Sequence, residues 1–258
     1  MEPRRFRITA EQMKIAIIGY GRMGHEIEKA AVSRGHKVVC IIDQDNTADF
    51  DNDAFRQADV AIEFTSSATA QENILKSWEQ GVPVVCGSTG WLNAGSRKWI
   101  DEHVGGRNRL VTASNFSLGV NVMFAANRLM ARLFDGYDNY SVNIHEVHHV
   151  NKKDHPSGTA ITLAEDIMAE NSRYDGWVEP EETAPAERDI PITHEREEDV
   201  KGIHVVEWDS PICTLTLRHD AKSRDGFAIG ALVAAEWLAS QQTPGHYTML
   251  DVLAHIHE

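Results

Sequence analysis

Cysteine is scarce in this sequence. Its 258 residues include only three, Cys40, Cys86 and Cys213, and they lie far apart. No C-x-x-C pair occurs, so neither a zinc ribbon nor a thioredoxin-like redox site is indicated. Cys40 and Cys86 lie in apolar, strand-like runs. We therefore interpret them as reduced, buried thiols, as is typical of a cytoplasmic protein.

Long apolar runs and a net positive charge are also missing. No run approaches the roughly 20 apolar residues that cross a bilayer, so no contact with a membrane is predicted. The formal net charge is −14, which argues against a nucleic-acid partner. Residues 1–12 carry three arginines but no apolar segment, unlike a secretory signal. Because the apolar run begins at Met13, we expect residues 1–12 to form a leader or extension.

The first half of the chain alternates short apolar segments with helical ones. We expect strands at 14–18, 37–42, 60–64, 82–86 and 110–113, and helices at 23–33, 71–80 and 95–103. Alternation of this kind predicts an α/β fold, with a Rossmann-like, doubly wound parallel sheet covered on both faces.

The second half follows a different pattern. We expect helices at 120–134, 157–170 and 227–240, strands at 140–148, 200–208 and 212–218, and a long polar, proline-bearing loop at 173–199. Residues 13–116 would then form a dinucleotide-binding domain that is completed by residues 226–258. Residues 117–225 would form a second, α+β domain with a mostly antiparallel sheet, responsible for substrate binding and oligomerisation.

A glycine-rich turn follows the first strand. The sequence G-x-G-x-x-G has little weight alone, but here it joins a strand to a helix, and Asp43 closes the next strand. This context predicts a dinucleotide site: the glycines let the backbone approach a pyrophosphate, and Asp43 accepts hydrogen bonds from a ribose. A tight turn without a ligand is the alternative. The predicted cofactor residues of this turn are Gly19, Tyr20, Gly21, Arg22, Met23 and Gly24.

The residues around Asp43 favour NADH over NADPH. Gln44 and Asp45 follow it, and no arginine or lysine is present to pair with a 2′-phosphate. NADPH stays possible because Arg22, in the glycine turn, could reach that phosphate.

Two later strand ends carry small polar residues. Ligands of open parallel sheets bind outside the carboxyl ends of the strands, so both segments are candidates for the nicotinamide end of the cofactor. Ordinary turn chemistry would explain either one alone. The predicted residues are Gly87, Ser88 and Thr89 after the fourth strand, and Ala113, Ser114, Asn115 and Phe116 after the fifth.

Residues 145–149 match H-E-x-x-H, a zinc-protease signature that requires a helix. Here the motif follows an alternating, strand-like segment and precedes a loop, so we predict no metal at this position. We predict an anion pocket instead. His148, His149, Lys152 and Lys153 lie close in sequence, and Ser157-Gly158-Thr159 then opens a helix whose N–H groups suit a carboxylate. A solvated charged loop is the alternative.

The same region resembles a known family. Residues 146–160 read E-V-H-H-x-x-K-x-D-x-P-S-G-T-A, which is similar to the signature of the dihydrodipicolinate reductases. Further matches in the family's order are G-R-M-G at 21–24, G-S-T-G at 87–90, N-F-S-L-G-V-N at 115–121, and Arg224 before F-A-I-G at 227–230.

This resemblance implies an enzyme that uses NAD(P)H to reduce 4-hydroxy-tetrahydrodipicolinate, a small dicarboxylate, to tetrahydrodipicolinate in lysine biosynthesis through diaminopimelate. It also implies a homotetramer joined through the sheet of the second domain. His148 would be the acid/base residue and Lys152 the proton donor. The substrate-binding residues would be His149, Ser157, Gly158 and Thr159.

Some positions depart from the family pattern. The glycine turn is one residue shorter than in many members, and the arginine that would read a 2′-phosphate is absent. His155 stands where a small residue is common, and Lys153 where an apolar one is. None of these departures removes a proposed catalytic group.

Two other functions fit part of the sequence. Another Rossmann oxidoreductase, such as a homoserine or aspartate-family dehydrogenase, would share the glycine turn but would not need the signature at 146–160. A regulatory protein that senses dinucleotides would have no use for His148 with Lys152. If the chain is a reductase, we expect hinges near 114–117 and 224–227 that close the two domains; a rigid, preformed cleft is the alternative.

Overall fold

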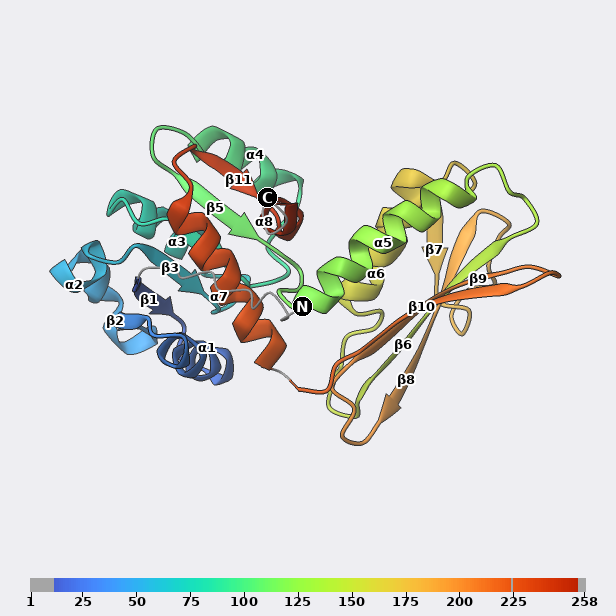
Figure 1. Cartoon of the computed structure of the whole chain (residues 1–258), viewed down its shortest axis with the longest axis horizontal. Coiled ribbons are helices and arrows are strands. Elements are labelled where there is room, and N and C mark those ends of the chain that lie inside the picture. The colour runs from blue at the N-terminus through green and yellow to red at the C-terminus, as the bar shows by residue number, and fades with distance from the viewer. Residues whose placement is uncertain (1–11, 224, 255–258) are drawn as a thin grey trace, which may run out of the picture. The chain divides into compact units, whose positions relative to one another are not determined.

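The computed structural model describes residues 12–223 and 225–254, which form two compact units (Figure 1). The first unit contains the described residues up to Phe116 and those from Phe227 onward, and the second unit is Ser117–Gly226. Most of the expected leader, and Arg224 of the family signature, lie outside the described residues.

A six-stranded parallel sheet forms the centre of the first unit, in the order β11-β5-β4-β3-β1-β2. β1 is buried along most of its length, as expected of a parallel strand with helices on both faces. The strands are β1 (Lys14–Ile18), β2 (Lys37–Ile42), β3 (Val60–Glu63), β4 (Val84–Cys86), β5 (Arg109–Thr112) and β11 (Gly245–Tyr247).

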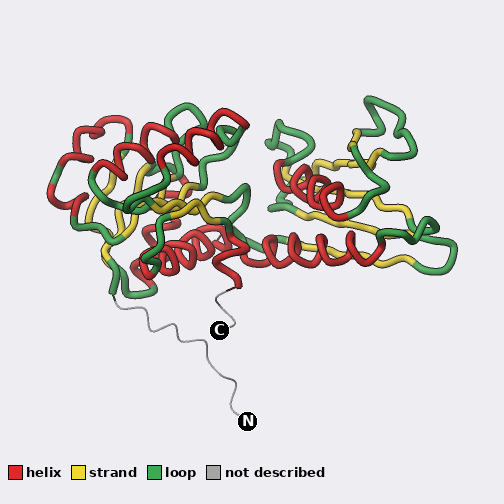
Figure 2. The backbone as a smooth tube through the Cα atoms, turned by 90° about the horizontal axis from the view of Figure 1, so that it is seen from above, coloured by secondary structure: helices red, strands yellow, loops and turns green. Residues whose placement is uncertain are grey.

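Helices cover both sides of this sheet (Figure 2). Ala16 and Ile18 of β1 pack in a cluster with residues of the helices that follow β2, β3 and β4. Ile15 and Ile17 point to the opposite face and are also fully buried. The helices are α1 (Arg22–Ser33), the 3₁₀ helix η1 (Gln44–Asp51), α2 (Asp53–Arg56), α3 (Ala70–Glu79), α4 (Ala94–His103), α7 (Asp225–Ser240) and α8 (Met249–Ala254). The Rossmann-like fold predicted from the sequence is confirmed.

The second unit packs two helices on a five-stranded sheet of order β10-β9-β6-β8-β7. Apolar residues of α5, α6 and the central strands form its core, around the fully buried Trp208. The elements are α5 (Leu118–Phe134), β6 (Ser141–His149), α6 (Gly158–Glu170), β7 (Gly176–Val178), β8 (Asp189–Glu197), β9 (Ile203–Asp209) and β10 (Thr214–Asp220).

The prediction of a loop over 173–199 was wrong, because β7 and β8 lie within it. β8 runs parallel to both β6 and β7, whereas β9 is antiparallel to β6 and β10, so the sheet is mixed rather than mostly antiparallel. Prolines and charges concealed β8, although its alternating Ile190 and Ile192 are buried. Pro191 lies where β8 changes partner, because β8 pairs with β7 over Asp189–Pro191 and with β6 from Ile192 onward.

Several short elements of the first unit were also not predicted from the sequence. The pattern did not predict η1, α2, β11 or α8. β11 has only three residues, which is too short for alternation to be recognised, and it extends the sheet by pairing with β5. None of the helices in the described part of the chain is long and apolar enough to cross a membrane.

One helix contact permits no side chain. A Cβ added to Gly230 of α7 would lie 1.7 Å from the backbone oxygen of Phe116, the residue after the β5 turn. By contrast, a Cβ on Gly226, in the first turn of the same helix, has its nearest neighbour at 3.8 Å, an ordinary van der Waals distance.

We expect Gly230→Ala to lower the free energy of unfolding by about 1–3 kcal/mol, because backbone must move to admit the methyl group. Gly226→Ala is the matched control and should be no less stable than the wild type, since alanine favours the helix. Urea unfolding measures both. Equal stability of the two variants would contradict this close approach.

Candidate active site

The glycine turn after β1 is built from contacts that exclude side chains. Gly19 has a φ of +91°, and an added Cβ would lie 2.4 Å from the oxygen of Phe64. A Cβ on Gly24 would lie 2.3 Å from the oxygen of Gly19. These two glycines therefore have structural reasons to be glycine. Gly21 differs, because nothing lies within 4 Å of its Cβ position.

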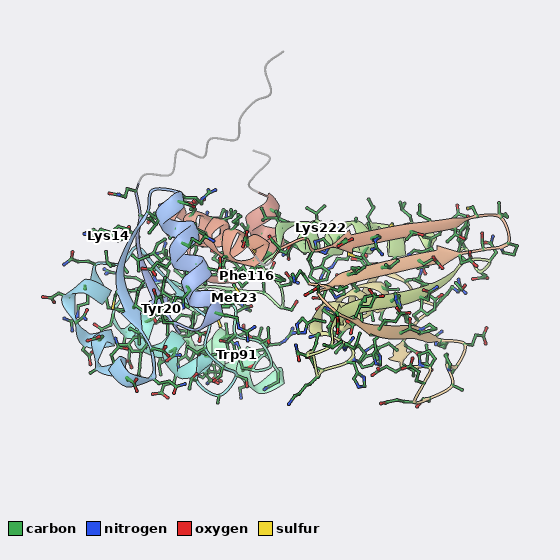
Figure 3. All side chains as sticks on the ribbon, turned by 90° about the horizontal axis from the view of Figure 1, so that it is seen from below. Lys14, Tyr20, Met23, Trp91, Phe116 and Lys222 are labelled. Atoms are coloured by element: carbon green, nitrogen blue, oxygen red, sulfur yellow. The ribbon has the colours of Figure 1, made fainter. Side chains whose placement is uncertain are left out.

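The space at Gly21 adjoins the N-terminus of α1. Gly21 is the N-cap, no side chain caps the helix, and its first turn has no acidic residue. The first N–H groups of a helix seek partners outside it, and the helix dipole favours an anion there. This arrangement fits a dinucleotide pyrophosphate. Figure 3 shows Tyr20 and Met23 beside the helix start, and Arg22 is exposed there.

Asp43 lies directly beyond β2, beside this turn. The N–H of Gly19 donates to the oxygen of Ile42 at 2.7 Å, so the turn and the end of β2 are adjacent. The Asp43 carboxylate caps η1 by accepting the N–H of Gln44 at 2.9 Å, and it is exposed. Its second oxygen can accept a ribose hydroxyl, so the residue fits the predicted cofactor role.

The ends of β3 and β4 also meet. A Cβ on Gly87 would overlap the ring of Phe64, and the N–H of Thr65 donates to the Ser88 hydroxyl at 2.8 Å. Thr89 is exposed beside them. The predicted residues after β5 differ in exposure: Asn115 and Phe116 are buried, Ala113 is half-buried and Ser114 is exposed.

Sequence reasoning missed Glu63, the last residue of β3. Its side chain is fully buried. It accepts hydrogen bonds from the N–H and the hydroxyl of Thr65, and from the Cys86 thiol at 3.0 Å. Burial raises the pKa of the Cys86 thiol, and the Glu63 carboxylate adds to that effect. Glu63 thus fixes the turn that carries Thr65. Its position at the end of an apolar strand was the available signal.

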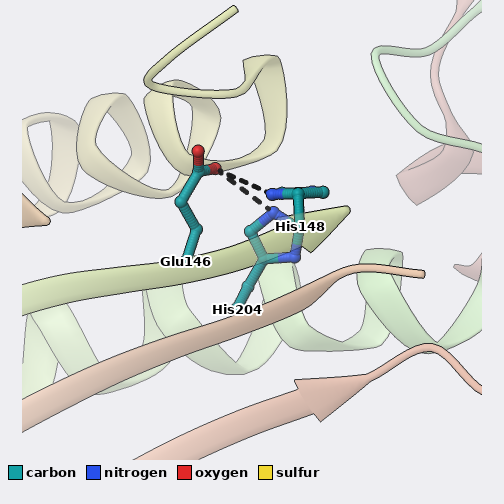
Figure 4. Close-up of side chains that lie close together, drawn as sticks. All are labelled: Glu146, His148 and His204. Atoms are coloured by element: carbon teal, nitrogen blue, oxygen red, sulfur yellow. Dashed lines mark ion pairs between the residues drawn. The ribbon is translucent and has the colours of Figure 1, made fainter. Parts of the chain in front are cut away.

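In the second unit, the buried carboxylate of Glu146 lies beside the imidazoles of His148 and His204 (Figure 4). Glu146 and His148 alternate with their neighbours on β6, so both point to the face that α6 covers. The Glu146 carboxylate has no exposure. One of its oxygens lies 3.7 Å from Nδ1 of His148 and 3.8 Å from Nε2 of His204 on β9.

The same carboxylate holds the start of α6. The N–H of Ser157 donates to Glu146 at 3.1 Å, and the Ser157 hydroxyl lies 3.1 Å from Nε2 of His204. That hydroxyl also caps α6 by accepting the N–H of Ala160. Gly158 is exposed, with open space around its Cβ position, and Thr159 is buried. The start of α6 therefore lies beside His148, around the same Glu146 oxygen, and its role as a carboxylate cradle stays a prediction.

Arg196 of β8 orders the loop that carries Lys152. Its guanidinium donates to the backbone oxygens of Lys152 at 3.2 Å and Asp154 at 2.9 Å, and lies 3.6 Å from Glu146. The Lys152 ammonium donates to the Asp154 carboxylate at 2.5 Å. Neither Arg196 nor His204 was predicted, because both come from strands that lie far from the signature in sequence.

The adjacent residues His148 and His149 lie on opposite faces of the sheet. Alternation along β6 places His149 on the opposite face of the sheet from His148, and its buried Nδ1 has no hydrogen-bond partner in the structure. The secondary structure of residues 145–149 also bears on the H-E-x-x-H motif. Residues 145–149 form a strand, as predicted, so the helix that this zinc signature needs is not formed.

Comparisons with known proteins agree with this geometry. Two family profiles match: dihydrodipicolinate reductase, N-terminus, over residues 13–116, and dihydrodipicolinate reductase, C-terminus, over residues 119–253. A 4-hydroxy-tetrahydrodipicolinate reductase of Christiangramia forsetii is 45% identical over 94% of this chain and 98% of its own length. The chain belongs to the dihydrodipicolinate reductase family. The resemblance seen in the sequence is confirmed.

More distant relatives extend the match. A 4-hydroxy-tetrahydrodipicolinate reductase of Archaeoglobus fulgidus is 35% identical over 93% of this chain and 100% of its own. A dipicolinate-bound dihydrodipicolinate reductase from Paenisporosarcina sp. TG-14 has the same fold, with a TM-score of 0.73 at 22% identity over 92% of this chain and 98% of that one. As a member of the family, the chain is a pyridine-nucleotide-dependent oxidoreductase of lysine biosynthesis through diaminopimelate.

Burial keeps two histidines of the candidate active site, His148 and His204, neutral. Burial lowers the pKa of His148 to about 4; the Glu146 carboxylate opposes this shift, whereas the charges of Lys152 and Arg196 add to it. Burial, together with the nearby His148, lowers the pKa of His204 to about 3. Near pH 7 both imidazoles are therefore uncharged.

These shifts predict an acid-sensitive fold. Histidine in an unfolded chain has a pKa near 6.5. Below that pH, His148 and His204 are therefore protonated in the unfolded chain but stay neutral in the folded one. The free energy of unfolding should not depend on these two histidines above about pH 6.5. Below that pH it should fall towards pH 4, by up to about 1.4 kcal/mol per pH unit for each histidine. Urea unfolding at pH 7, 6 and 5 measures this loss.

His204→Gln removes one of the two titrating groups. We expect this variant to lose less stability than the wild type between pH 7 and pH 5, even if it is less stable at pH 7. Identical losses in both proteins would show that His204 takes up its proton in the folded state.

Proposed function

We propose that the chain reduces 4-hydroxy-tetrahydrodipicolinate to tetrahydrodipicolinate, with NADH as the preferred reductant. The strongest support is the start of α6, held by Glu146 beside a neutral His148 and the loop of Lys152. This arrangement offers an anion cradle next to proton-transfer groups. It lies in a chain that is 45% identical to a reductase with this name.

The substrate carboxylates would bind at the N-terminus of α6. This helix has no acidic residue in its first turn, and the N-cap hydroxyl of Ser157 is held in place by His204. The open backbone at Gly158 admits a carboxylate, and Thr159 adds a hydroxyl. The dipicolinate bound to the Paenisporosarcina protein supports a dicarboxylate ligand of this size. His149 faces away from His148, but it is the last residue of β6, so it would contact the substrate around the end of the strand.

Proton transfer would be shared between two residues. Lys152 carries the proton that the reaction consumes, once its ammonium leaves Asp154 for the substrate. His148, kept neutral by burial, can relay a proton by accepting it at one ring nitrogen while releasing one from the other, and is neutral again after the transfer. When bound, the reduced nicotinamide supplies a hydride to the substrate ring. The hydroxyl group of the substrate takes up a proton and leaves as water, so the ring gains one hydride and each turnover consumes one proton, the one that Lys152 carries.

The first unit would hold the cofactor through Gly19–Gly24, Asp43 and the turns after β4 and β5. The outer face of the second sheet, opposite α5 and α6, would join subunits into a homotetramer. It carries half-buried residues such as His145, Thr193 and Val205. We also propose a cytoplasmic location, which agrees with the free thiols of Cys40, Cys86 and Cys213.

A coupled assay tests the proposed reaction. The product of the preceding synthase is generated in the cuvette, and oxidation of NADH is followed by absorbance. We expect turnover that depends on this substrate. If NADH is oxidised at the same rate when aspartate semialdehyde replaces the synthase product, the substrate assignment is wrong.

His148→Gln and Lys152→Ala should each lower kcat at least about 100-fold, which is the usual contribution of a positioned acid or base. The affinity for NADH, measured by fluorescence titration, should stay unchanged, because both residues lie outside the cofactor-binding unit. Lys98→Ala is the control, since Lys98 is an exposed lysine on α4 that pairs with Glu102 and has no part in the proposed chemistry. If the two variants lose NADH binding while they remain folded, the division of labour between the units is wrong.

KM for NADH should equal or lie below KM for NADPH, since the carboxylates of Asp43 and Asp45 repel a 2′-phosphate. Asp43→Asn should reduce the difference between the two KM values, whereas Arg22→Ala should raise KM for NADPH more than KM for NADH. Initial rates with both cofactors measure this preference. A KM for NADPH that is tenfold below that for NADH would contradict it.

A further inference from the structure

A second group of histidines and a carboxylate lies outside the active site. His155 belongs to the loop between β6 and α6, Glu179 directly follows β7, and His194 is on β8. Nδ1 of His155 lies 2.7 Å and Nδ1 of His194 lies 3.1 Å from the same oxygen of Glu179. Three segments that are separate in sequence therefore converge on one carboxylate.

The group is shielded and incompletely satisfied. Glu179 is only 8% exposed. Nδ1 of His194 has no contact with solvent and no hydrogen bond of acceptable geometry, although it faces the carboxylate. The imidazole and the carboxylate are therefore in ion-pair distance, but they are not aligned for a hydrogen bond. The active-site network does not use any of these three residues.

The donor atoms are those that zinc prefers. Two imidazole nitrogens and one carboxylate oxygen lie within 4.8 Å of one another. In a tetrahedral zinc site the ligand atoms are about 3.4 Å apart, so small movements would bring these three into place. Glu181, whose carboxylate is 3.7 Å from Nδ1 of His194, is available as a fourth ligand.

One adjustment is needed. The rings of His155 and His194 are stacked, with centroids 4.3 Å apart and planes 17° from parallel. A metal ion in the plane of both rings requires one of them to turn. The side chain of His155 is 39% exposed, so it has room to do so.

We propose that His155, Glu179 and His194 form a binding site for a divalent transition metal of the zinc class, with Glu181 or water as the fourth ligand. Bound metal would tie the loop of Lys152 to β8 and to the segment after β7. Among the described residues, the other group of this kind is Glu146 with His148 and His204, which belongs to the candidate active site, where Glu146 already accepts the Ser157 N–H.

Zinc titration of the metal-free chain tests this site. Calorimetry with zinc chloride, after chelation and dialysis, should show binding in the wild type. His194→Ala and Glu179→Gln should weaken it at least tenfold. His145→Ala is the matched control: His145 lies on the same sheet and in the H-E-x-x-H motif, but bonds to Thr193 and is not a proposed ligand. It should bind zinc as the wild type does.

Two further measurements keep the test independent of folding and of catalysis. Zinc should raise the Tm of the wild type and of His145→Ala, and have a smaller effect on His194→Ala. Cobalt in place of zinc should give the absorption of a four-coordinate ion, lost in Glu179→Gln. No zinc binding by the wild type, or equal binding by all the variants, would overturn the proposal while leaving the proposed reaction intact.

Discussion

The second unit depends on how it accommodates the charge of Glu146. A carboxylate with no exposure to solvent is strongly unfavourable unless hydrogen bonds and positive charge compensate it. Here the compensation comes from the N–H of Ser157 and the guanidinium of Arg196, and the neutral imidazole of His204 packs against the same carboxylate. Each belongs to a different element, so the carboxylate is stable only where β6, β8, β9 and α6 meet. The candidate substrate cradle is therefore formed by assembly of the sheet.

The first unit uses a similar arrangement. Glu63 is fully buried at the end of β3 and receives the N–H of Thr65 in the following turn. In each unit, a glutamate at or near the end of a strand fixes a backbone turn at which a ligand is expected. Such a group holds the backbone without covering the surface that the ligand must approach, because its charge lies beneath the turn.

The loop between β6 and α6 is held from two sides. Ser157 bonds to Glu146 and His204, whereas His155 contacts Glu179. Arg196 secures the backbone of this loop at Lys152. A proton donor on a loop needs freedom to reach its substrate and a fixed position to return to. The contacts at both ends confine the loop, and the exposed Asp154 provides the resting partner of Lys152.

The sequence by itself determined the strand–glycine–helix turn at 14–24, the parallel sheet and the signature at 146–160, because local periodicity and fixed spacing encode them. It concealed β7 and β8 among prolines and charges. Only the tertiary structure decided that Glu146 meets Arg196 of β8 and His204 of β9. Those outcomes depend on strand pairing between residues about 50 positions apart, such as His148 beside Arg196 and Glu146 beside His204, and local patterns carry no information about such register.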